Sequence, residues 1–369
     1  MLSGCTCLGV VGEGDDSGTR LADGGLKVVV GLAELAQTHV IPSEGVTLSA
    51  PNTSLFFHAV GGRDTLLLVT LAPPELTAPE VDGWLGDAGL GSVSLSPPSA
   101  LSPTEANGPA YASDRFSATI PAAWMKPGLQ LTVRAANAEA SAPIATAIGA
   151  DTPVLVRVLP FYLFGANETN TQPLAVVSGP DAETLAEVRA KWPVATVMPR
   201  LHPAGAVSWP SLVVPPRTDQ HQVKHPGYVL TAGDKQNDGF DVMSAALGIV
   251  GKLRRANGED PTAVQYYAPL LLVDSAGASY FLGGGLGSVG GAASVGDSNY
   301  RGIFIHEQGH ALSLPHQGDA YQAGKYPYVG GSLAGSAWGY DPDHHEFLGN
   351  RSGGRASISR AHPGDQFPH

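Results

Sequence analysis

Four residues in the last third of the sequence have the types and the spacing of a catalytic metal site. His306 and His310 are four residues apart, so on a helix both side chains lie on one face and can reach the same metal ion. Glu307 projects to the edge of that face, where its carboxylate can contact a metal-bound water rather than the metal. His316 can supply a third nitrogen once the chain has left the helix. Three ligands leave one tetrahedral position of zinc open for water, which is the catalytic pattern.

The residues around this motif predict a helix that ends before His316. Asp297 or Ser298 can cap its start. Two glycines weaken it by about 1 kcal/mol each relative to alanine, so tertiary packing must hold it. Pro315 cannot continue a helix and forces Leu314 towards an extended conformation, which helps to turn His316 back. The apolar surface that this helix can bury is contributed by Tyr300, Ile303, Phe304 and Ala311.

A zinc ion held by three neutral imidazoles keeps its double charge and lowers the pKa of a bound water to about 7. Glu307 is then the general base that accepts the proton of this water, and it returns the proton to the departing amine. Zinc stabilises the oxyanion as a Lewis acid. The sequence therefore predicts a zinc-dependent endopeptidase, with Glu307 as the catalytic residue and His306, His310 and His316 as the metal ligands.

The segment from His306 to His316 resembles the elongated zinc signature of the metzincin clan. Within that clan, the stretch Gly302–His316, followed by Trp338-Gly339-Tyr340-Asp341, resembles the secreted bacterial metallopeptidases of the StcE/TagA type. This group includes ToxR-regulated lipoproteins, mucin-degrading enzymes and dictomalleins. A second patch is similar to a segment that precedes the protease domain in those proteins: Phe116–Pro121, Trp124 and Lys126–Leu129. The resemblance implies mucin-type O-glycoproteins as substrates.

Two features depart from the metzincin pattern. Ser313 stands where the clan usually has glycine, at the point where the backbone turns out of the helix, and a left-handed serine costs on the order of 1 kcal/mol. The clan also has a methionine-containing turn after the third histidine. The methionines of this sequence all precede the motif, so we expect the chain to be truncated before that turn; they are Met1, Met125, Met198 and Met243.

The resemblance implies an α+β fold: a metzincin-like zinc peptidase domain, with a twisted mixed sheet, a backing helix and an active-site helix, preceded by a small antiparallel β-sandwich. The strongest predicted helix is 241–256, with apolar residues at helical spacing and a stop at Asn257-Gly258. An apolar strand at 266–273 and a glycine-rich loop at 277–296 follow it. This order matches the N-terminal half of a metzincin, in which a backing helix braces the active-site helix and an edge strand forms the upper rim of the cleft.

Composition shifts divide the chain into three parts. Residues 1–25 form a lipobox-like N-terminus and a flexible Gly/Asp/Ser-rich linker, residues 26–150 a β-sandwich, and residues 151–369 the peptidase domain. We expect the sandwich to support the peptidase domain, with a weak carbohydrate or substrate platform as the alternative. Its predicted strands are 26–30, 45–48, 54–59, 65–71, 92–95, 115–120 and 129–135; a strand at 154–164 and a short helix at 181–191 open the second domain.

The charge balance and the cysteines restrict the function further. With 21 Lys+Arg against 33 Asp+Glu, the net charge of −12 disfavours nucleic acid and anionic membranes as partners. Both cysteines lie at the extreme N-terminus, so the folded part has no internal disulfide framework. Leu2-Ser3-Gly4-Cys5 resembles a lipobox, although the basic and apolar regions of a lipoprotein signal do not precede it. We expect an extracytoplasmic protein, secreted or anchored to the bacterial surface through a lipid on Cys5.

Three alternatives remain open. A polar cluster beyond the third histidine could be a second metal site, but a surface turn fits it better. Glu346 could replace His316 as the third ligand, as in another class of zinc peptidases, although the spacing of His316 favours the histidine. Finally, Ser313 and the missing methionine turn are compatible with a surface-anchored binding or adhesion lipoprotein whose metal site is vestigial or structural. The polar cluster consists of Asp341, Asp343, His344, His345 and Glu346.

Overall fold

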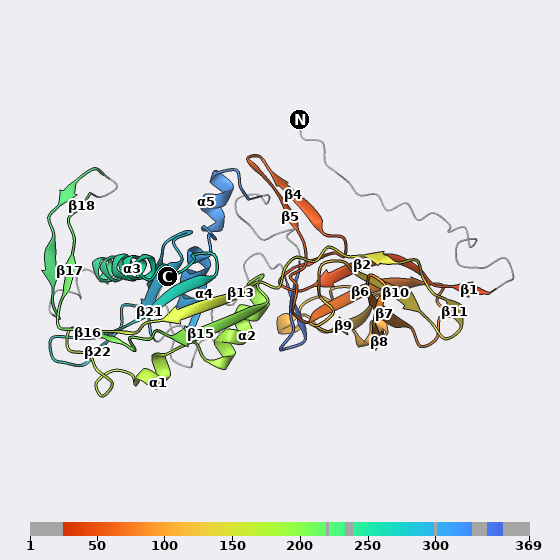
Figure 1. Cartoon of the computed structure of the whole chain (residues 1–369), viewed down its shortest axis with the longest axis horizontal. Helices are drawn as coiled ribbons and strands as arrows, with labels where there is room; N and C mark the ends of the chain where they lie inside the picture. Colours follow the sequence, from red (N-terminus) through yellow and green to blue (C-terminus); the bar gives the residue numbers. More distant parts are fainter. Residues whose placement is uncertain (1–24, 219–220, 233–238, 299–300, 327–337, 350–369) are drawn as a thin grey trace.

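The computed structural model describes residues 25–218, 221–232, 239–298, 301–326 and 338–349. It is a mixed α+β fold in which strands outnumber helices (Figure 1). In the described ranges no helix has both the length and the apolar character needed to cross a membrane.

The N-terminal half contains two four-stranded antiparallel sheets (Figure 1). Their strand orders are β3-β2-β6-β9 and β12-β10-β7-β8. Two short pairs, β1–β11 and β4–β5, lie beside them. The strands are β1 (Leu26–Lys27), β2 (Val29–Ala36), β3 (Val40–Pro42), β4 (Val46–Ala50), β5 (Thr53–Phe57), β6 (Thr65–Ala72), β7 (Glu80–Leu85), β8 (Ala88–Ser94), β9 (Phe116–Ile120), β10 (Leu129–Arg134), β11 (Ala138–Glu139) and β12 (Ile144–Ala145).

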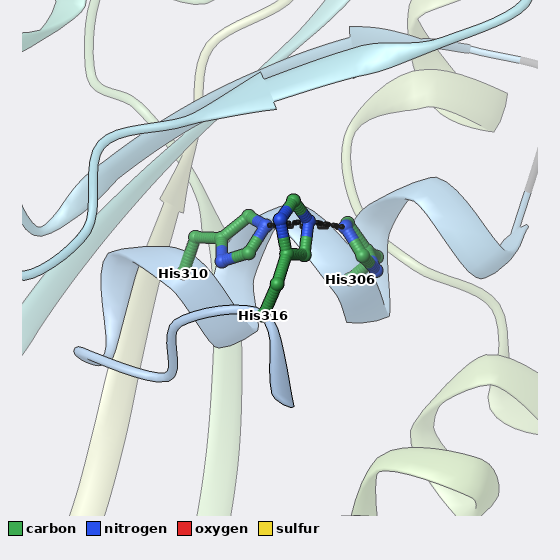
Figure 2. A group of neighbouring side chains, drawn as sticks. All are labelled: His306, His310 and His316. Atoms are coloured by element: carbon green, nitrogen blue, oxygen red, sulfur yellow. Dashed lines mark hydrogen bonds between the residues drawn. The ribbon is translucent and has the colours of Figure 1, made fainter. Parts of the chain in front are cut away.

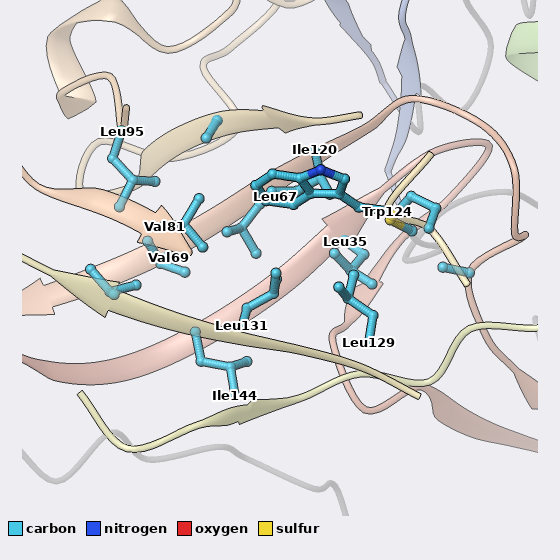
Figure 3. Close-up of a cluster of buried hydrophobic side chains, with 14 of the residues drawn as sticks. Leu35, Leu67, Val69, Val81, Leu95, Ile120, Trp124, Leu129, Leu131 and Ile144 are labelled. Carbon is cyan, nitrogen blue, oxygen red and sulfur yellow. The ribbon is translucent and has the colours of Figure 1, made fainter. Parts of the chain in front are cut away.

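One hydrophobic core joins these two sheets (Figure 3). Leu35 and Leu67 enter it from the first sheet, and Leu131 enters it from the second, each with 1% or less of its surface exposed. Side chains alternate between the faces of a strand, so β10 buries Leu129, Leu131 and Val133, whereas Gln130 is exposed and Thr132 is half-buried. Most of the strands predicted from sequence are present here, but β3, β7, β11 and β12 were not predicted.

A second sheet occupies the C-terminal half. Its centre is β21, whose nearly continuous apolar run is buried on both faces, as is typical of a strand in a largely parallel sheet. β13, β14 and β24 pair with β21 in parallel, β15 and β16 extend the sheet, and β23 pairs antiparallel with β24 at the other edge. The bounds are β13 (Pro153–Val158), β14 (Phe161–Leu163), β15 (Thr196–Leu201), β16 (Val207–Trp209), β21 (Val264–Val273), β22 (Ser279–Tyr280), β23 (Gly285–Gly287) and β24 (Ala293–Asp297).

The remaining elements among the described residues are short strand pairs, five α-helices and two short 3-10 helices at Pro98–Ala100 and Glu105–Asn107. The predicted helix at 181–191 is present, and the Asp181 side chain caps it by accepting a hydrogen bond from the Thr184 N–H at 2.7 Å. The other bounds are β17 (Leu212–Val214), β18 (Arg217–Thr218), β19 (Lys224–His225), β20 (Tyr228–Leu230), β25 (Gly339–Asp341), β26 (Glu346–Leu348), α1 (Leu174–Val177), α2 (Ala182–Lys191), α3 (Gly239–Ala256), α4 (Arg301–Ala311) and α5 (Gln317–Gln322).

The helices cover opposite faces of the larger sheet, and this corrects one expectation. α3 is the helix predicted at 241–256, but it packs with Tyr266 and its alternate neighbours on β21, whereas α2 and α4 share a core with Tyr267 on the other face. Figure 1 shows α3 and α2 on opposite sides of the strands. α2, not α3, therefore supports the helix that carries the zinc motif. The residue spacing predicted the buried stripe of α3 correctly, but a stripe does not indicate which sheet face it covers.

The glycine-rich segment 277–296 is not the loop that we predicted. It contains β22 and β23, and it forms most of β24, which is fully buried. Glycine weakens a strand and often marks a place where other backbone approaches closely. The sequence pattern alone therefore suggested a loop where the structure has the edge of the main sheet.

The two halves of the chain are connected beyond the linker before β13. Arg63 is buried and its guanidinium donates hydrogen bonds to the carbonyl groups of Trp192 and Val194, next to the end of α2. The chain after His316 also returns to the N-terminal sheets, where Tyr340 and Phe347 of β25 and β26 pack on residues of β2, β3 and β6. The N-terminal half thus contacts the segments on both sides of the zinc motif.

Candidate metal centre and active site

The helix α4 is fixed to the sheet by three buried contacts. The Phe304 ring stacks on Trp192, with the ring centroids 6.0 Å apart, and meets the edge of the Tyr267 ring at 4.9 Å. The Gln308 side chain is fully buried, and its Nε2 donates a hydrogen bond to the Tyr266 carbonyl at 2.9 Å. These contacts fix both the rotation and the position of α4 along β21, although two glycines lower its intrinsic helical stability.

The edge strand β23 approaches α4 so closely that only glycine fits. A Cβ atom at Gly287 would lie 2.4 Å from the Glu307 carbonyl oxygen and 2.8 Å from the His310 Cβ. A Cβ at Gly285 would lie 2.6 Å from the Glu307 Cγ. The glycines that obscured this strand in the sequence therefore bring the edge of the sheet into contact with the motif.

The end of α4 has the left-handed turn that was predicted at Ser313. The φ angle of Ser313 is 76°, in the region that usually favours glycine. The Ser313 N–H donates to the His310 carbonyl at 2.9 Å, and the Leu314 N–H donates to the Gly309 carbonyl at 3.0 Å. The serine therefore adopts the conformation of the usual glycine, and the chain leaves the helix in the direction that brings His316 back.

The three predicted ligands converge on one point (Figure 2). The Nε2 atoms of His306 and His310 are 3.1 Å apart, those of His310 and His316 are 3.2 Å apart, and those of His316 and His306 are 3.3 Å apart. Three nitrogens at about 2.0–2.1 Å from a tetrahedral zinc ion would be separated by about 3.3–3.4 Å. The donor set and its spacing therefore fit one such ion.

The second nitrogen of His310 supports the same ligand geometry. The Nδ1 atom of His310 lies 2.7 Å from the Leu314 carbonyl oxygen, which can only accept, so Nδ1 carries the hydrogen and Nε2 is free to bind a metal. The Nδ1 atom of His316 lies 3.6 Å from the Asp319 carboxylate, which is beyond hydrogen-bonding distance, and both side chains are largely exposed. The pKa of His306 is lowered by burial and by the neighbouring His310 and His316, which favours the neutral, metal-binding form.

Glu307 lies beside these nitrogens with 8% of its surface exposed. Burial raises the pKa of its carboxyl group, while the neighbouring His310, the hydrogen bond from the Gly287 N–H and the neighbouring His316 act in the opposite direction. A carboxylate in such a position is a suitable general base because its pKa can approach that of the group it deprotonates.

The alternatives from the sequence lie elsewhere. Glu346 belongs to a separate group of possible ligands with Asp341 and His344, on the β25–β26 hairpin. In that group the Asp341 carboxylate accepts hydrogen bonds from the N–H groups of Asp343 and His344, which is the pattern of a polar turn. Cys5 and Tyr300 lie outside the described residues, and Asp297 belongs to β24, where its carboxylate accepts from the Gly283 N–H at 3.0 Å.

Sequence reasoning missed the residues that support the ligands. Gln308 is one of the variable positions of the motif, so the motif itself assigns it no role. Asp319 follows His316 by three residues, in a segment without apolar periodicity. The position of Asp319 one turn after a predicted ligand was a signal that could have indicated it, because ligating histidines usually pair their second nitrogen with a carboxylate or a carbonyl.

Comparison with known proteins gives a consistent classification. The chain is 51% identical over 313 residues to dictomallein of Burkholderia mallei (strain SAVP1) and to dictomallein of Burkholderia pseudomallei (strain K96243), which covers 85% of this chain and 46% of each relative. It is 41% identical over 317 residues to dictomallein-1 of Dictyostelium discoideum, covering 85% of this chain and 52% of the relative. The chain thus spans about half the length of these relatives. The profile of the peptidase M66 family matches residues 105–367, and the chain belongs to this family of metallopeptidases.

Proposed function

We propose that this chain is a zinc-dependent endopeptidase. The observation that carries the proposal is the triangle of Nε2 atoms from His306, His310 and His316, with sides of 3.1–3.3 Å, beside the buried carboxyl group of Glu307. Three imidazoles with one open position are the donor set of catalytic zinc sites, whereas structural zinc sites use four protein ligands, commonly with thiolates. Both cysteines of this chain precede residue 8, far from the motif in sequence.

The roles of the residues follow from their positions. When bound, zinc supplies a Lewis acid that acidifies water and polarises a carbonyl group. Glu307 takes a proton from the water that attacks the scissile carbonyl and delivers it to the departing amine. The contact with Gly285 and Gly287 holds the Glu307 side chain in place. The hydrogen bond from His310 to the Leu314 carbonyl keeps that imidazole in the tautomer that presents Nε2.

The edge strand β23 is suited to hold an extended peptide. It pairs with β24 on one side, and within the described part of the chain no strand pairs with its other side. An extended substrate can add to such an edge through main-chain hydrogen bonds, which do not depend on side-chain identity. β23 lies directly over Glu307 and His310, so a peptide bound there would pass the three nitrogens.

The finer classification is also a proposal. We infer a metzincin-like peptidase domain at 151–369, because β15, β13, β21 and β24 run parallel in this order, β23 adds an antiparallel edge, and α4, which carries the motif, shares one face of the sheet with α2. We infer a β-sandwich at 26–150, because two antiparallel sheets share one core there. Arg63 of this unit donates hydrogen bonds to the Trp192 and Val194 carbonyls next to the end of α2, and this contact supports the proposal that the sandwich stabilises the peptidase domain.

The substrates and the location follow from the resemblance to StcE/TagA-type enzymes. We propose that the enzyme acts outside the cytoplasm, on extracellular proteins that include mucin-type O-glycoproteins, and that Cys5 carries a lipid anchor. Mass spectrometry of Cys5 in protein purified from a bacterial membrane fraction tests the anchor.

The function is tested by cleavage of casein and of an O-glycosylated mucin, each with and without a chelator. We expect chelator-sensitive cleavage that zinc restores, and a loss of about 10²–10⁴-fold in Glu307→Ala, the range for removing a general base. Bound zinc, measured on the same preparations, should be unchanged in Glu307→Ala. Full activity in Glu307→Ala would remove Glu307 from the mechanism.

Binding of mucin without chelator-sensitive cleavage would instead favour an adhesion protein with a vestigial site. Ser313 no longer supports that alternative, because its left-handed φ angle gives the turn that the usual glycine would give. The Nε2 atoms of the histidines on both sides of this turn lie 3.1–3.3 Å apart, which supports a site that can still bind a metal ion.

A further inference from the structure

The short helix α5, which begins directly after the third ligand, has no buried residue. His316 is its N-cap residue, and the His316 carbonyl accepts the first hydrogen bond of the helix, from the Ala320 N–H at 3.0 Å. The position of the His316 backbone is therefore coupled to the position of α5. Since α5 buries no apolar stripe, core packing does not fix it, and contacts at its ends must do so.

The far end of α5 is held by a residue of the N-terminal half. The Asn52 backbone N–H donates a hydrogen bond to the Gly324 carbonyl at 2.8 Å, and the Asn52 Nδ2 donates to the Ala323 carbonyl at 2.9 Å. Carbonyl groups at the end of a helix need such partners. A Cβ atom at Gly324 would lie only 2.7 Å from Asn52 Nδ2, so the contact is close. The side-chain bond joins residues 271 positions apart in the sequence.

Asn52 lies at the tip of the β4–β5 hairpin, which extends away from the N-terminal sheets to reach α5 (Figure 1). The two strands pair only with each other among the described strands, from Val46↔Phe57 to Ala50↔Thr53. A two-stranded hairpin has little stability of its own in water, so a long hairpin that ends in a contact to another unit indicates a role for that contact.

We propose that Asn52 is a positioning residue for the third metal ligand. The hairpin tip fixes the end of α5, α5 fixes the backbone of His316, and the site is completed by a contact from outside the peptidase unit. Asp319, on the same helix, faces the Nδ1 atom of His316, so a shift of α5 would move the ligand and its partner together. This inference rests on the proposed function, because it assigns a role in a metal site.

The test compares the zinc affinity of the full chain with that of Asn52→Ala and Asn52→Asp, by competition with a chromophoric chelator. Asn52→Ala removes one hydrogen bond to α5, and the expected rise in the Kd for Zn²⁺ is about two- to tenfold. Asn52→Asp also places a carboxylate against the Ala323 carbonyl, and we expect the larger rise. The absorption spectrum of the Co²⁺-loaded protein should shift in both variants, because the ligand field depends on the third nitrogen.

Asn137→Ala is the matched control. Asn137 is also an exposed asparagine of the N-terminal half, and it makes two hydrogen bonds there, to Glu75 and Thr77, without contact to α5. It should leave the Kd and the Co²⁺ spectrum unchanged while changing thermal stability about as much as Asn52→Ala does. Combining Asn52→Ala with His316→Ala tests whether Asn52 acts through His316. If it does, Asn52→Ala does not raise the Kd for Zn²⁺ any further once the His316 side chain has been removed.

The results separate this inference from the proposed function. If wild-type protein binds Zn²⁺ and Asn52→Ala binds it with the same Kd and the same Co²⁺ spectrum, the positioning role is wrong. An equal loss of affinity in the His316→Ala background would also overturn it. If the wild-type protein takes up no metal, the proposed function fails instead.

Discussion

The two helices that carry the candidate site are supported in opposite ways. α4 carries His306, Glu307 and His310 and is anchored by a buried aromatic stack and by the buried Gln308. α5 follows His316, buries no residue, and is held at its ends. Two candidate ligands and the proposed general base are thus fixed by the core, whereas the third candidate ligand, in our proposal, depends on a surface contact. The difference suggests that the third ligand is the part of the site most sensitive to changes far away in sequence.

The largest difference between the two helices is expected in the affinity for zinc, when His310 on α4 and Asp319 on α5 are each replaced by alanine. His310→Ala removes the nitrogen that lies 3.1 and 3.2 Å from the other two, and we expect the affinity for zinc to fall by more than about 100-fold. Asp319→Ala removes only an exposed carboxylate 3.6 Å from the His316 ring and should lower the affinity for zinc by less than about fivefold. Metal analysis after dialysis measures both. Equal losses would mean that Asp319 is itself essential to the site.

Truncation of buried and exposed side chains tests the difference in anchoring. Phe304→Ala removes the ring between Trp192 and Tyr267 and should lower the free energy of unfolding by about 3–5 kcal/mol. Gln322→Ala, on the exposed surface of α5, should change it by about 0.5 kcal/mol or less. Urea denaturation followed by fluorescence gives both values. A large cost for Gln322→Ala would contradict the view that α5 is free of core packing.

Replacing a glycine by alanine should have opposite effects on stability at β23, which contacts α4, and within α5. Gly287→Ala places a Cβ 2.4 Å from the Glu307 carbonyl oxygen, which belongs to the backbone and cannot move away easily, so we expect a cost of about 1–3 kcal/mol and a loss of activity. Gly318→Ala, in α5, meets no atom within 4 Å and should stabilise its helix by up to about 1 kcal/mol. Thermal denaturation of the two variants and of wild type makes the comparison. An unaffected Gly287→Ala protein would show that β23 can move away from α4.

The same contrast explains what the sequence could and could not predict. The convergence of the three histidines was predictable because their spacing is local: one helical turn separates His306 from His310, and Pro315 favours the turn before His316. The turn at Ser313 was implied by the resemblance to the metzincin pattern, in which glycine usually stands at this position, and the φ angle of 76° agrees with it. Asn52 could not be found, because nothing in its own neighbourhood indicates a partner 271 residues away.

The errors in predicting the fold from the sequence have a common physical origin. The apolar spacing of α3 indicated a buried stripe, but the stripe faces Tyr266 rather than the side of the sheet where α4 lies. The strands β23 and β24 were missed because glycine has low strand propensity, although here it is required by the approach of α4. In both cases a tertiary contact decided what local sequence preference could not.

A gain in stability with no change in zinc affinity is expected at Ser313, where α4 ends and the segment leading to α5 begins. Serine at φ 76° costs on the order of 1 kcal/mol relative to glycine, so Ser313→Gly should raise the free energy of unfolding by up to about 1 kcal/mol. Its N–H still donates to the His310 carbonyl, so the direction of the chain towards His316 and the affinity for zinc should stay the same. Differential scanning calorimetry and the zinc competition assay measure the two quantities. A fall in zinc affinity would mean that the Ser313 side chain, which lies near Gly290, also fixes the path to the third ligand.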